Sequence, residues 1–307
     1  DGVPDAVWMR VRRPRFVTHP AVPVGSPAPR PAATDPPPSY VRAFERVQEH
    51  LHAGNSYEVN LTYRDRVRSD IDPETAYLRL RAASPAPYAG YLRHGWRDGD
   101  VHLLSSSPER YASIDRERTL VARPIKGTTP RGATPEEDER LRRLLTEDPK
   151  LRAENLMITD LLRNDLALVC DVGTVEVPGL MEVESYASVH QLVTTVRGRL
   201  RPEVGSVDAV RALFPAGSMT GAPKRRTMEV IDEVEADPRG VYAGAFGWLS
   251  ADGRADLGVV IRSLVAVPRA GRWDYTLGTG GGITVRSDLL EEWRETTWKA
   301  ERLRAVL

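Results

Sequence analysis

The sequence predicts an α+β fold in which antiparallel sheets are flanked by helices. Alternating apolar and polar runs cluster in consecutive pairs and triplets, as they do in hairpins. Runs with a 3.6-residue apolar repeat lie between these clusters and predict helices. The strands therefore do not alternate singly with helices, which favours antiparallel sheets over a doubly wound parallel sheet. No repeat of 20–50 residues is present along the chain.

The individual elements follow from local signals. Ser39 is expected to cap the first helix and Gly54 to end it, and prolines at the first turn are expected to open two further helices. The expected helices cover residues 39–52, 73–83, 135–146, 150–166, 207–214, 223–235 and 288–307. The expected strands cover residues 57–67, two short antiparallel runs within 111–122, 172–177, 181–186, 189–200, 241–249, 255–267 and 273–284.

The first 38 residues differ in composition from the rest of the chain. They hold ten of the 24 prolines. Beyond a strand-like stretch at residues 6–11, this composition is typical of an extended linker. We therefore expect a linker and the remnant of an N-terminal region over residues 1–38, and an ordered domain over residues 39–307. Because the first residue is Asp1, we expect a processed chain or a piece of a longer one.

Composition argues against several classes of protein. The 43 basic and 43 acidic residues balance, so no global field favours nucleic acid or an acidic membrane surface as a partner. Cys170 is the only cysteine, which rules out a disulfide within the chain, argues against a cysteine-based metal site and favours a reducing cytosol. No apolar run approaches the roughly 20 residues that a membrane span needs. We therefore expect a cytoplasmic protein.

The stretch RPIKGTT (123–129) holds a lysine in a constrained backbone. Lys126 lies between Pro124 and Gly127, which fix its position. A lysine is a nucleophile only when neutral, and burial or a nearby cation such as Arg123 would lower its pKa. The alternative is a partly buried lysine that is paired with a carboxylate.

Carboxylates on two predicted helices indicate a metal site. The apolar spacing of AENLMITDLLRND (153–165) places Glu154 on the buried face, where it needs an arginine or a metal ion. The last helix carries a polar line beside its apolar stripe, formed by Glu292, Glu295, Lys299 and Arg302. This line is either an exposed ladder of ion pairs or one side of the site. In the second case, Glu154 and Glu295 would hold one Mg²⁺, and Glu292 would bind it through water.

Three stretches are expected to bind anions. Gly280, Gly281 and Gly282 would offer backbone N–H groups to a carboxylate, although a tight turn is the usual alternative. Thr220 precedes the start of a predicted helix, where free amides favour an anion. Arg262 is the only charge in an apolar run and needs a carboxylate from the protein or from a ligand. With Lys126 and a metal, these groups suit a small substrate that has two carboxylates.

Eight separated motifs, in the same order, resemble those of the chorismate-utilising enzymes. This family includes the anthranilate, aminodeoxychorismate, isochorismate and salicylate synthases. The motifs are NSYEVNLT (55–62), SSSPERY (105–111), RPIKGT (123–128), AENLMITDLLRND (153–165), FPAGSMTGAPK (214–224), VVIRSLV (259–265), GGGI (280–283) and EEWRETTWKA (291–300). The resemblance covers residues 39–307 as a catalytic domain and implies the family's fold, chorismate as substrate and Mg²⁺ as cofactor.

The resemblance also implies roles for single residues. It implies that Glu154 and Glu295 bind Mg²⁺, with Glu292 as a more distant acid, and that Lys299 assists the departing ring hydroxyl. The groups that would contact the pyruvyl end of the substrate are Thr220, Arg262, Gly280, Gly281 and Gly282. Glu109 would do general acid–base work, and His190 would lie beside the departing hydroxyl. Without the resemblance, a hydrogen-bonded core imidazole would be the preferred interpretation of His190.

Lys126 distinguishes the branches of this family. A lysine at this position is similar to the aminodeoxychorismate synthases, whereas anthranilate synthases usually have alanine there. In the former, the lysine is proposed to add at ring carbon 2 and expel the carbon 4 hydroxyl, after which ammonia attacks carbon 4 and expels the lysine. The water-adding synthases carry a base lysine where this chain has Glu58.

The resemblance therefore implies component I of the aminodeoxychorismate branch. Its ammonia would come from a glutamine amidotransferase subunit or fused domain. Two alternatives are an anthranilate synthase with an unusual lysine and an inactive, truncated subunit that only binds an amidotransferase.

Overall fold

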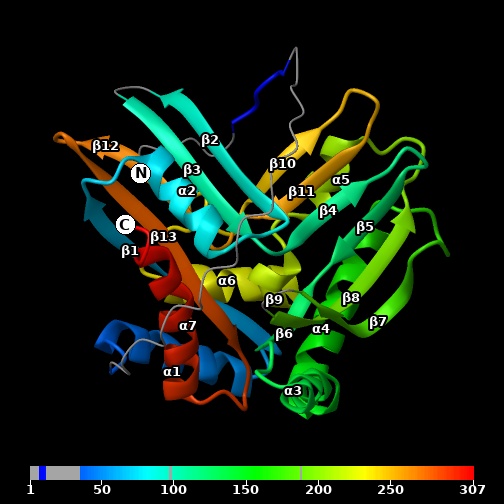
Figure 1. Cartoon of the computed structure of the whole chain (residues 1–307). Coiled ribbons are helices and arrows are strands. Elements are labelled where there is room, and N and C mark those ends of the chain that lie inside the picture. The colour runs from blue at the N-terminus through cyan, green and yellow to red at the C-terminus, as the bar shows by residue number, and fades with distance from the viewer. Residues whose placement is uncertain (1–6, 12–34, 97–98, 187–188) are drawn as a thin grey trace.

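Two antiparallel sheets with helices around them make up the fold, which confirms the predicted α+β class (Figure 1). The structure, a computed structural model, describes residues 7–11, 35–96, 99–186 and 189–307. The helices are α1 Pro38–His52, α2 Pro73–Ala83, α3 Pro135–Glu147, α4 Pro149–Ala167, α5 Ser206–Leu213, the short 3₁₀ helix η1 Gly217–Met219, α6 Lys224–Val234 and α7 Leu289–Arg304. The strands are β1 Glu58–Ser69, β2 Tyr88–Trp96, β3 Gly99–Ser107, β4 Arg110–Ile114, β5 Thr119–Arg123, β6 Ile125–Pro130, β7 Glu176–Ser185, β8 Val189–Arg199, β9 Gly221–Ala222, β10 Ala245–Leu249, β11 Ala255–Val259, β12 Ser263–Arg269 and β13 Arg272–Ile283.

The chain crosses between the two sheets at points that later matter for the site. The first sheet has the strand order β2-β3-β12-β13-β1-β9, and the second has β10-β11-β4-β5-β8-β6, with β7 also paired to β8. Figure 1 shows the first sheet at the left and the second at the right. The chain passes from the first sheet to the second between β3 and β4 and back again between β11 and β12; in between, only the short strand β9 returns to the first sheet. Residues 108–109 and 260–262 therefore form two crossovers, which we call the seam.

Three apolar clusters hold the helices on the sheets. One packs α4 and α5 against the second sheet, around Ile158 and Leu213. The other two lie along the first sheet, and α7 contributes to both of them, with Trp293 in one and Ala300 in the other. Because burial of each large apolar side chain contributes about 1.5–3 kcal/mol, these contacts fix the rotation of α7 about its axis. The polar line of α7 therefore keeps a fixed orientation relative to the sheets.

Most predicted helices are confirmed, but the start of the first one differs. Helix α1 begins at Pro38, with Pro37 as its N-cap and no side-chain cap, so Ser39 is not the capping residue. Proline at the first position presets the helical φ angle and has no N–H to satisfy, which removes the need for a serine cap. Helices α2 and α3 begin at their prolines as predicted. No helix in the described ranges is both long and apolar enough to cross a membrane.

Several predicted strands differ from the observed ones. The runs 172–177 and 181–186 form one strand, β7, whose register against β8 shifts twice, and residues 172–173 lie in a turn instead. Met181 has a φ of 55° within this strand, which is typical of a bulge that keeps two strand segments continuous. Residues 241–244 precede β10 as a turn. Residues 7–11 form no strand, while residues 1–6 and 12–34 of the predicted linker lie outside the described residues.

The predicted strand 255–267 is two strands that belong to different sheets. β11 pairs with β4 and β10 in the second sheet, and β12 pairs with β3 and β13 in the first. The break occurs at Arg262, whose φ of 48° lies in the left-handed region. Extended pairing cannot continue through this conformation, which is unusual for an arginine. Apolar composition alone could not indicate the break, because both halves are buried.

Candidate active site

Two predicted site residues lie on the seam between the sheets. Glu109 lies in the crossover from β3 to β4, and Arg262 lies in the crossover from β11 to β12. Backbone hydrogen bonds tie the crossovers together: Val259 N donates to Glu109 O over 3.0 Å, and Ser106 N donates to Arg262 O over 3.2 Å. The structure thus brings together two charged residues that are far apart in sequence.

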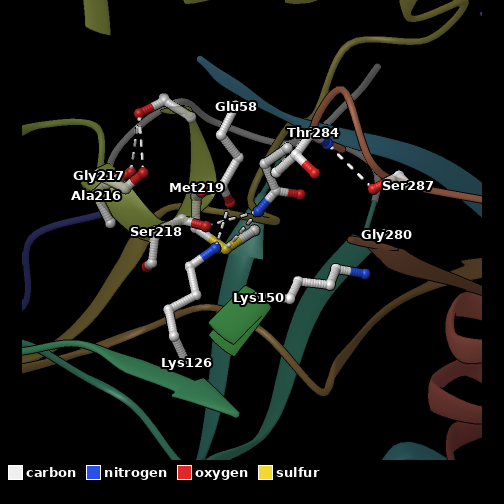
Figure 2. Close-up of polar contacts among 12 residues, drawn as sticks. Glu58, Lys126, Lys150, Ala216, Gly217, Ser218, Met219, Gly280, Thr284 and Ser287 are labelled. Carbon is white, nitrogen blue, oxygen red and sulfur yellow. Dashed lines mark hydrogen bonds and ion pairs between the residues drawn. The ribbon is translucent and has the colours of Figure 1, made fainter. Parts of the chain in front are cut away.

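Lys126 of β6 and Glu58 of β1 form a buried ion pair across the two sheets. The Lys126 ammonium donates to Glu58 Oε1 (Figure 2), and the residues are only 9% and 1% exposed. Burial by itself lowers the pKa of Lys126, but the carboxylates of Glu58, Glu154 and Glu109 outweigh burial, and the net shift is upward. The expectation of a lysine with a lowered pKa is therefore wrong for this state. Arg123, the cation expected to lower it, pairs with Glu184.

Glu58 is a site residue that the sequence indicated only as a departure from related enzymes. Its Oε2 atom is buried and has no hydrogen-bond partner among the described residues. A Cβ atom added to Gly282 would collide with Glu58 Oε1, so this glycine leaves room for the ion pair. Gly221 of β9 has a φ of 134° and lies against the backbone of Glu58. Two glycines from separate motifs therefore allow the chain to approach Glu58 closely.

Three predicted metal ligands come from α4 and α7. Burial raises the pKa of Glu154 to about 7, with Lys126 and Lys150 opposing the shift and Glu58 and Glu292 reinforcing it. Glu292 is buried and accepts hydrogen bonds from Ser287 Oγ at 2.8 Å and Lys150 Nζ at 3.2 Å. The side chain of Glu295 is 55% exposed and pairs with Lys299 at 2.7 Å, which lowers its pKa.

Lys150 is a cation of this site that the sequence did not single out. Its ammonium points away from the Lys126–Glu58 pair (Figure 2) and contacts Glu292. Burial lowers the pKa of Lys150, but the combined effect of Glu292, Glu154 and Glu295 exceeds it and raises the pKa. All three predicted metal ligands therefore lie within electrostatic range of one ammonium. The signal for Lys150 was its position four residues before Glu154, one helical turn away on α4.

This arrangement fits a Mg²⁺ site that uses few protein ligands. In the described part of the chain, no three acidic or histidine side chains converge closely enough to hold an ion together. Mg²⁺ usually binds one or two carboxylates and completes its octahedron with water and substrate oxygens. Glu154 and Glu295 share the same neighbouring cations, Lys126 and Lys150, so both face a position where positive charge is stabilised. Glu154 and Glu295 are therefore suitable ligands for Mg²⁺, and the Lys150 ammonium would compete with the ion for the same carboxylates.

The three glycines lie in a strand and not in a loop that cradles an anion. Gly280, Gly281 and Gly282 belong to β13 and pair with β1 in regular register. Strand β12 pairs with β13 only up to Leu277, so the opposite edge of the glycine stretch is not covered by β12. Lys299 donates to Gly280 O on this edge over 3.0 Å. The expected glycine nest is therefore replaced by a strand edge that does not pair with β12 and lies beside Lys299.

Thr220 and His190 differ from the other predicted site residues, because hydrogen bonds within the fold occupy their polar atoms. The Thr220 hydroxyl is buried and donates to Gly217 O over 3.2 Å, and Gly221–Ala222 pair with β1 as strand β9. The expected free amides before α6 are thus partly used by the fold. His190 lies between Ser185 Oγ at 2.7 Å and Asp138 Oδ1 at 3.0 Å, with both ring nitrogens partnered. This environment is that of a hydrogen-bonded core imidazole.

Glu109 is a buried acid surrounded by cations. Burial raises its pKa to about 7, although a hydrogen bond with Ser218 and the charges of Lys126, Arg262 and Lys299 oppose the shift. A carboxyl group with this pKa can both give and take a proton near neutral pH. Ser218, from the SMTGAPK stretch, is therefore a further polar residue of the site.

Glu109→Gln should stabilise the protein at pH 8 by about 3 kcal/mol and change its stability little at pH 5. The folded-state pKa of about 7 lies above the ordinary value of 4.5. Between these values the folded protein holds a proton that the unfolded chain releases, so the acid destabilises the fold progressively as pH rises from about 4.5 to 7. Glutamine avoids this penalty. Urea unfolding of both proteins at the two pH values measures the difference, and an equal effect at both would contradict it.

Residues 17–305 match the family of chorismate binding enzymes. The chain belongs to this family. The resemblance predicted from the eight motifs is thereby confirmed, and the family is one of enzymes.

Relatives with assigned names cover most of this chain. It is 51% identical over 270 residues to an aminodeoxychorismate synthase from Streptomyces pristinaespiralis, covering 88% of this chain and 36% of the relative. It is 42% identical to aminodeoxychorismate synthase component 1 from Klebsiella aerogenes, covering 86% and 56%. An anthranilate synthase component 1 from Haloarcula marismortui is also 42% identical, covering 86% and 52%. The chain thus spans between about a third and somewhat over half of the length of these relatives.

Solved structures agree with the fold. The anthranilate synthase component I of Streptococcus pneumoniae superposes with a TM-score of 0.75 at 33% identity, covering 86% of this chain and 57% of that one. The menaquinone-specific isochorismate synthase of Escherichia coli superposes with a TM-score of 0.76 at 22% identity, covering 88% and 60%. The second likeness concerns the fold alone.

Proposed function

We propose that this chain converts chorismate and ammonia to 4-amino-4-deoxychorismate, as component I of an aminodeoxychorismate synthase. The observation that carries this proposal is the position of Lys126, a buried amine that is paired with Glu58 and lies within electrostatic range of Glu154 and Glu109. The named relatives support the same reaction. Ammonia would come from a glutamine amidotransferase, as a subunit or a fused domain, and the reducing cytosol would be the compartment.

The substrate is proposed to lie between α7 and the seam. Glu154 and Glu295 would hold Mg²⁺, with Glu292 acting through water, and the bound ion would orient the ring carboxylate and assist loss of the hydroxyl. Arg262 at the seam would bind the carboxylate of the enolpyruvyl group, beside Lys299 and the edge of β13 at Gly280–Gly282 that does not pair with β12. Thr220 would support this region through η1. His190 is assigned a structural role because both of its ring nitrogens have partners.

Lys126 would act as the nucleophile after it loses a proton to Glu58, its hydrogen-bond acceptor. Nζ then forms a bond to ring carbon 2, the two ring double bonds shift, and the bond from carbon 4 to oxygen breaks. Glu109 would supply the proton with which the hydroxyl leaves as water, which its pKa of about 7 allows. Ammonia then bonds to carbon 4 and passes a proton to Glu109, the double bonds return, and Lys126 leaves carbon 2 as the free amine and recovers its proton from Glu58. The pyruvyl ether is retained.

Glu58→Gln should shift the alkaline rise of activity to lower pH. Glutamine cannot take the proton from Lys126, so kcat should also fall near neutral pH, by about 100-fold or more. The loss should shrink as pH rises, because removal of the Glu58 charge lowers the pKa of Lys126 and solvent can then take its proton. A profile of kcat against pH for both proteins measures the shift. An unchanged or higher midpoint would contradict the role of Glu58.

Anthranilate synthase is the second candidate, because a relative with that name is also 42% identical. Incubation with chorismate, Mg²⁺ and an ammonium salt distinguishes the two. The proposed product becomes 4-aminobenzoate after aminodeoxychorismate lyase is added, whereas fluorescent anthranilate as the sole product would reject the proposal. No turnover together with tight amidotransferase binding would favour the inactive subunit.

A further inference from the structure

The polar line of α7 changes from acidic to basic along the helix. Glu292 and Glu295 lie in its first half, and Lys299 and Arg302 lie in its second. From Glu295 to Arg302 the helix rises about 10 Å, at about 1.5 Å per residue. This length is on the scale of a small ring compound with a carboxylate at each end. The helix therefore presents one end suited to a metal-bound carboxylate and another suited to a free one.

The basic end borders a cavity together with the seam. The cavity is lined by Leu80, Ser84, Arg262, Trp298, Lys299, Arg302 and Leu303. Lys299 already has two partners, Glu295 and Gly280 O. Arg262 and Arg302 supply the other positive charges of this cavity.

Protein carboxylates compensate the two arginines only in part. Burial lowers the pKa of Arg262 and the positive charge of Arg302 lowers it further, while the carboxylates of Glu109 and Glu295 oppose this without reversing it. Burial also lowers the pKa of Arg302. Within the described ranges of the chain, no carboxylate forms an ion pair with either guanidinium. Two partly desolvated like charges at one cavity are unfavourable unless an anion joins them.

Arg302 is also held in place for such an anion. Its guanidinium lies over the ring of Trp298, 4.8 Å from the ring centre. Stacking on an aromatic ring fixes the plane of the guanidinium and reduces the freedom lost on binding. A planar guanidinium can then donate two parallel hydrogen bonds to a carboxylate.

We propose that Arg302 and Arg262 form a two-arginine clamp for the enolpyruvyl carboxylate of the substrate. The proposal rests on the proposed function and assigns to Arg302 the selection of ligands with a second carboxylate. Arg262 approaches from the seam and Arg302 from α7, so the clamp closes across the cavity. A ring ligand that has only the carboxylate on the metal side would not contact the two arginines. They would therefore add nothing to its affinity.

The test compares two ligands in calorimetric titrations with Mg²⁺ present and ammonia absent, with every variant built on Lys126→Ala so that no covalent step accompanies binding. Chorismate has both carboxylates, and shikimate has the ring carboxylate but a hydroxyl in place of the enolpyruvyl ether. Arg302→Gln should weaken chorismate binding by about 10-fold to 100-fold, the range for one charged hydrogen-bonding partner, and shikimate binding by less than about twofold. Arg294→Gln is the matched control, because Arg294 is exposed on the same helix and its loss removes the same charge. It should leave both affinities unchanged.

Two results would overturn the clamp. Chorismate affinity in Arg302→Gln equal to that in Arg294→Gln would show that Arg302 contributes nothing. Equal weakening of chorismate binding and shikimate binding would show a general effect on the fold or on the electrostatic potential of the site. If circular dichroism shows that Arg302→Gln does not fold, Arg302→Lys decides, since it keeps the charge but loses the paired donors; wild-type affinity for chorismate in that variant contradicts the clamp. Product identity in the protein with Lys126 intact tests the proposed function separately, because the Lys126→Ala background measures binding alone.

Discussion

Lys126→Ala should reduce formation of 4-amino-4-deoxychorismate by about 1,000-fold or more, the scale expected when a covalent nucleophile is removed. Chorismate and Mg²⁺ binding should change far less. The reason is geometric: Lys126 extends from β6 to Glu58, and the predicted carboxylate-binding groups lie on α7 and at the seam. Steady-state kinetics and calorimetric titrations of the same protein preparation measure the two effects.

Lys126→Arg is the control for charge. It keeps a cation beside Glu58 but cannot become neutral at an accessible pH, so it should be as inactive as the alanine variant while preserving the ion pair. Activity of the arginine variant near that of the wild type would mean that the residue provides charge alone. Loss of substrate and metal binding in proportion to activity would mean that Lys126 is mainly structural.

Glu154→Gln and Glu295→Gln should each weaken Mg²⁺ binding by at least about 10-fold to 100-fold, the range known for outer partners of metal sites alone. Both carboxylates lie within electrostatic range of Lys126 and Lys150. A divalent ion bound by the two carboxylates would take over part of the charge compensation that these ammonium groups provide. Glu292→Gln should have a smaller effect, because it would act through water. Calorimetric titration with MgCl₂ measures each affinity, and unchanged titrations for both glutamine variants would exclude the shared site.

Lys150→Met should change Mg²⁺ affinity in the opposite direction and serves as a control. The Lys150 ammonium contacts Glu292 and lies within range of Glu154 and Glu295, so it competes with the metal for the same charges. Methionine has a similar length and no charge, and Mg²⁺ should bind more tightly to this variant. Weaker binding would mean that Lys150 supports the site instead of competing for it.

Local chemistry was enough to predict the elements that depend on neighbours in the sequence. The prolines at the starts of α2 and α3 and the alternation of β1 and β13 gave bounds close to those observed, because caps and periodicity act over one or two turns. The chain order of separated motifs was likewise sufficient to indicate the family. Glu109 and Arg262, chosen from the sequence, do meet at the seam.

Tertiary structure decided the features that depend on distant partners. The run 255–267 has the same apolar character on both sides of Arg262, so only the sheets that receive β11 and β12 reveal the break. Lys126 and Glu58 are 68 positions apart, and Lys150 and Glu292 are 142 apart. The pKa of a lysine depends on the charges around it in space. The sequence could therefore identify Lys126 but not Glu58, the carboxylate that raises its pKa.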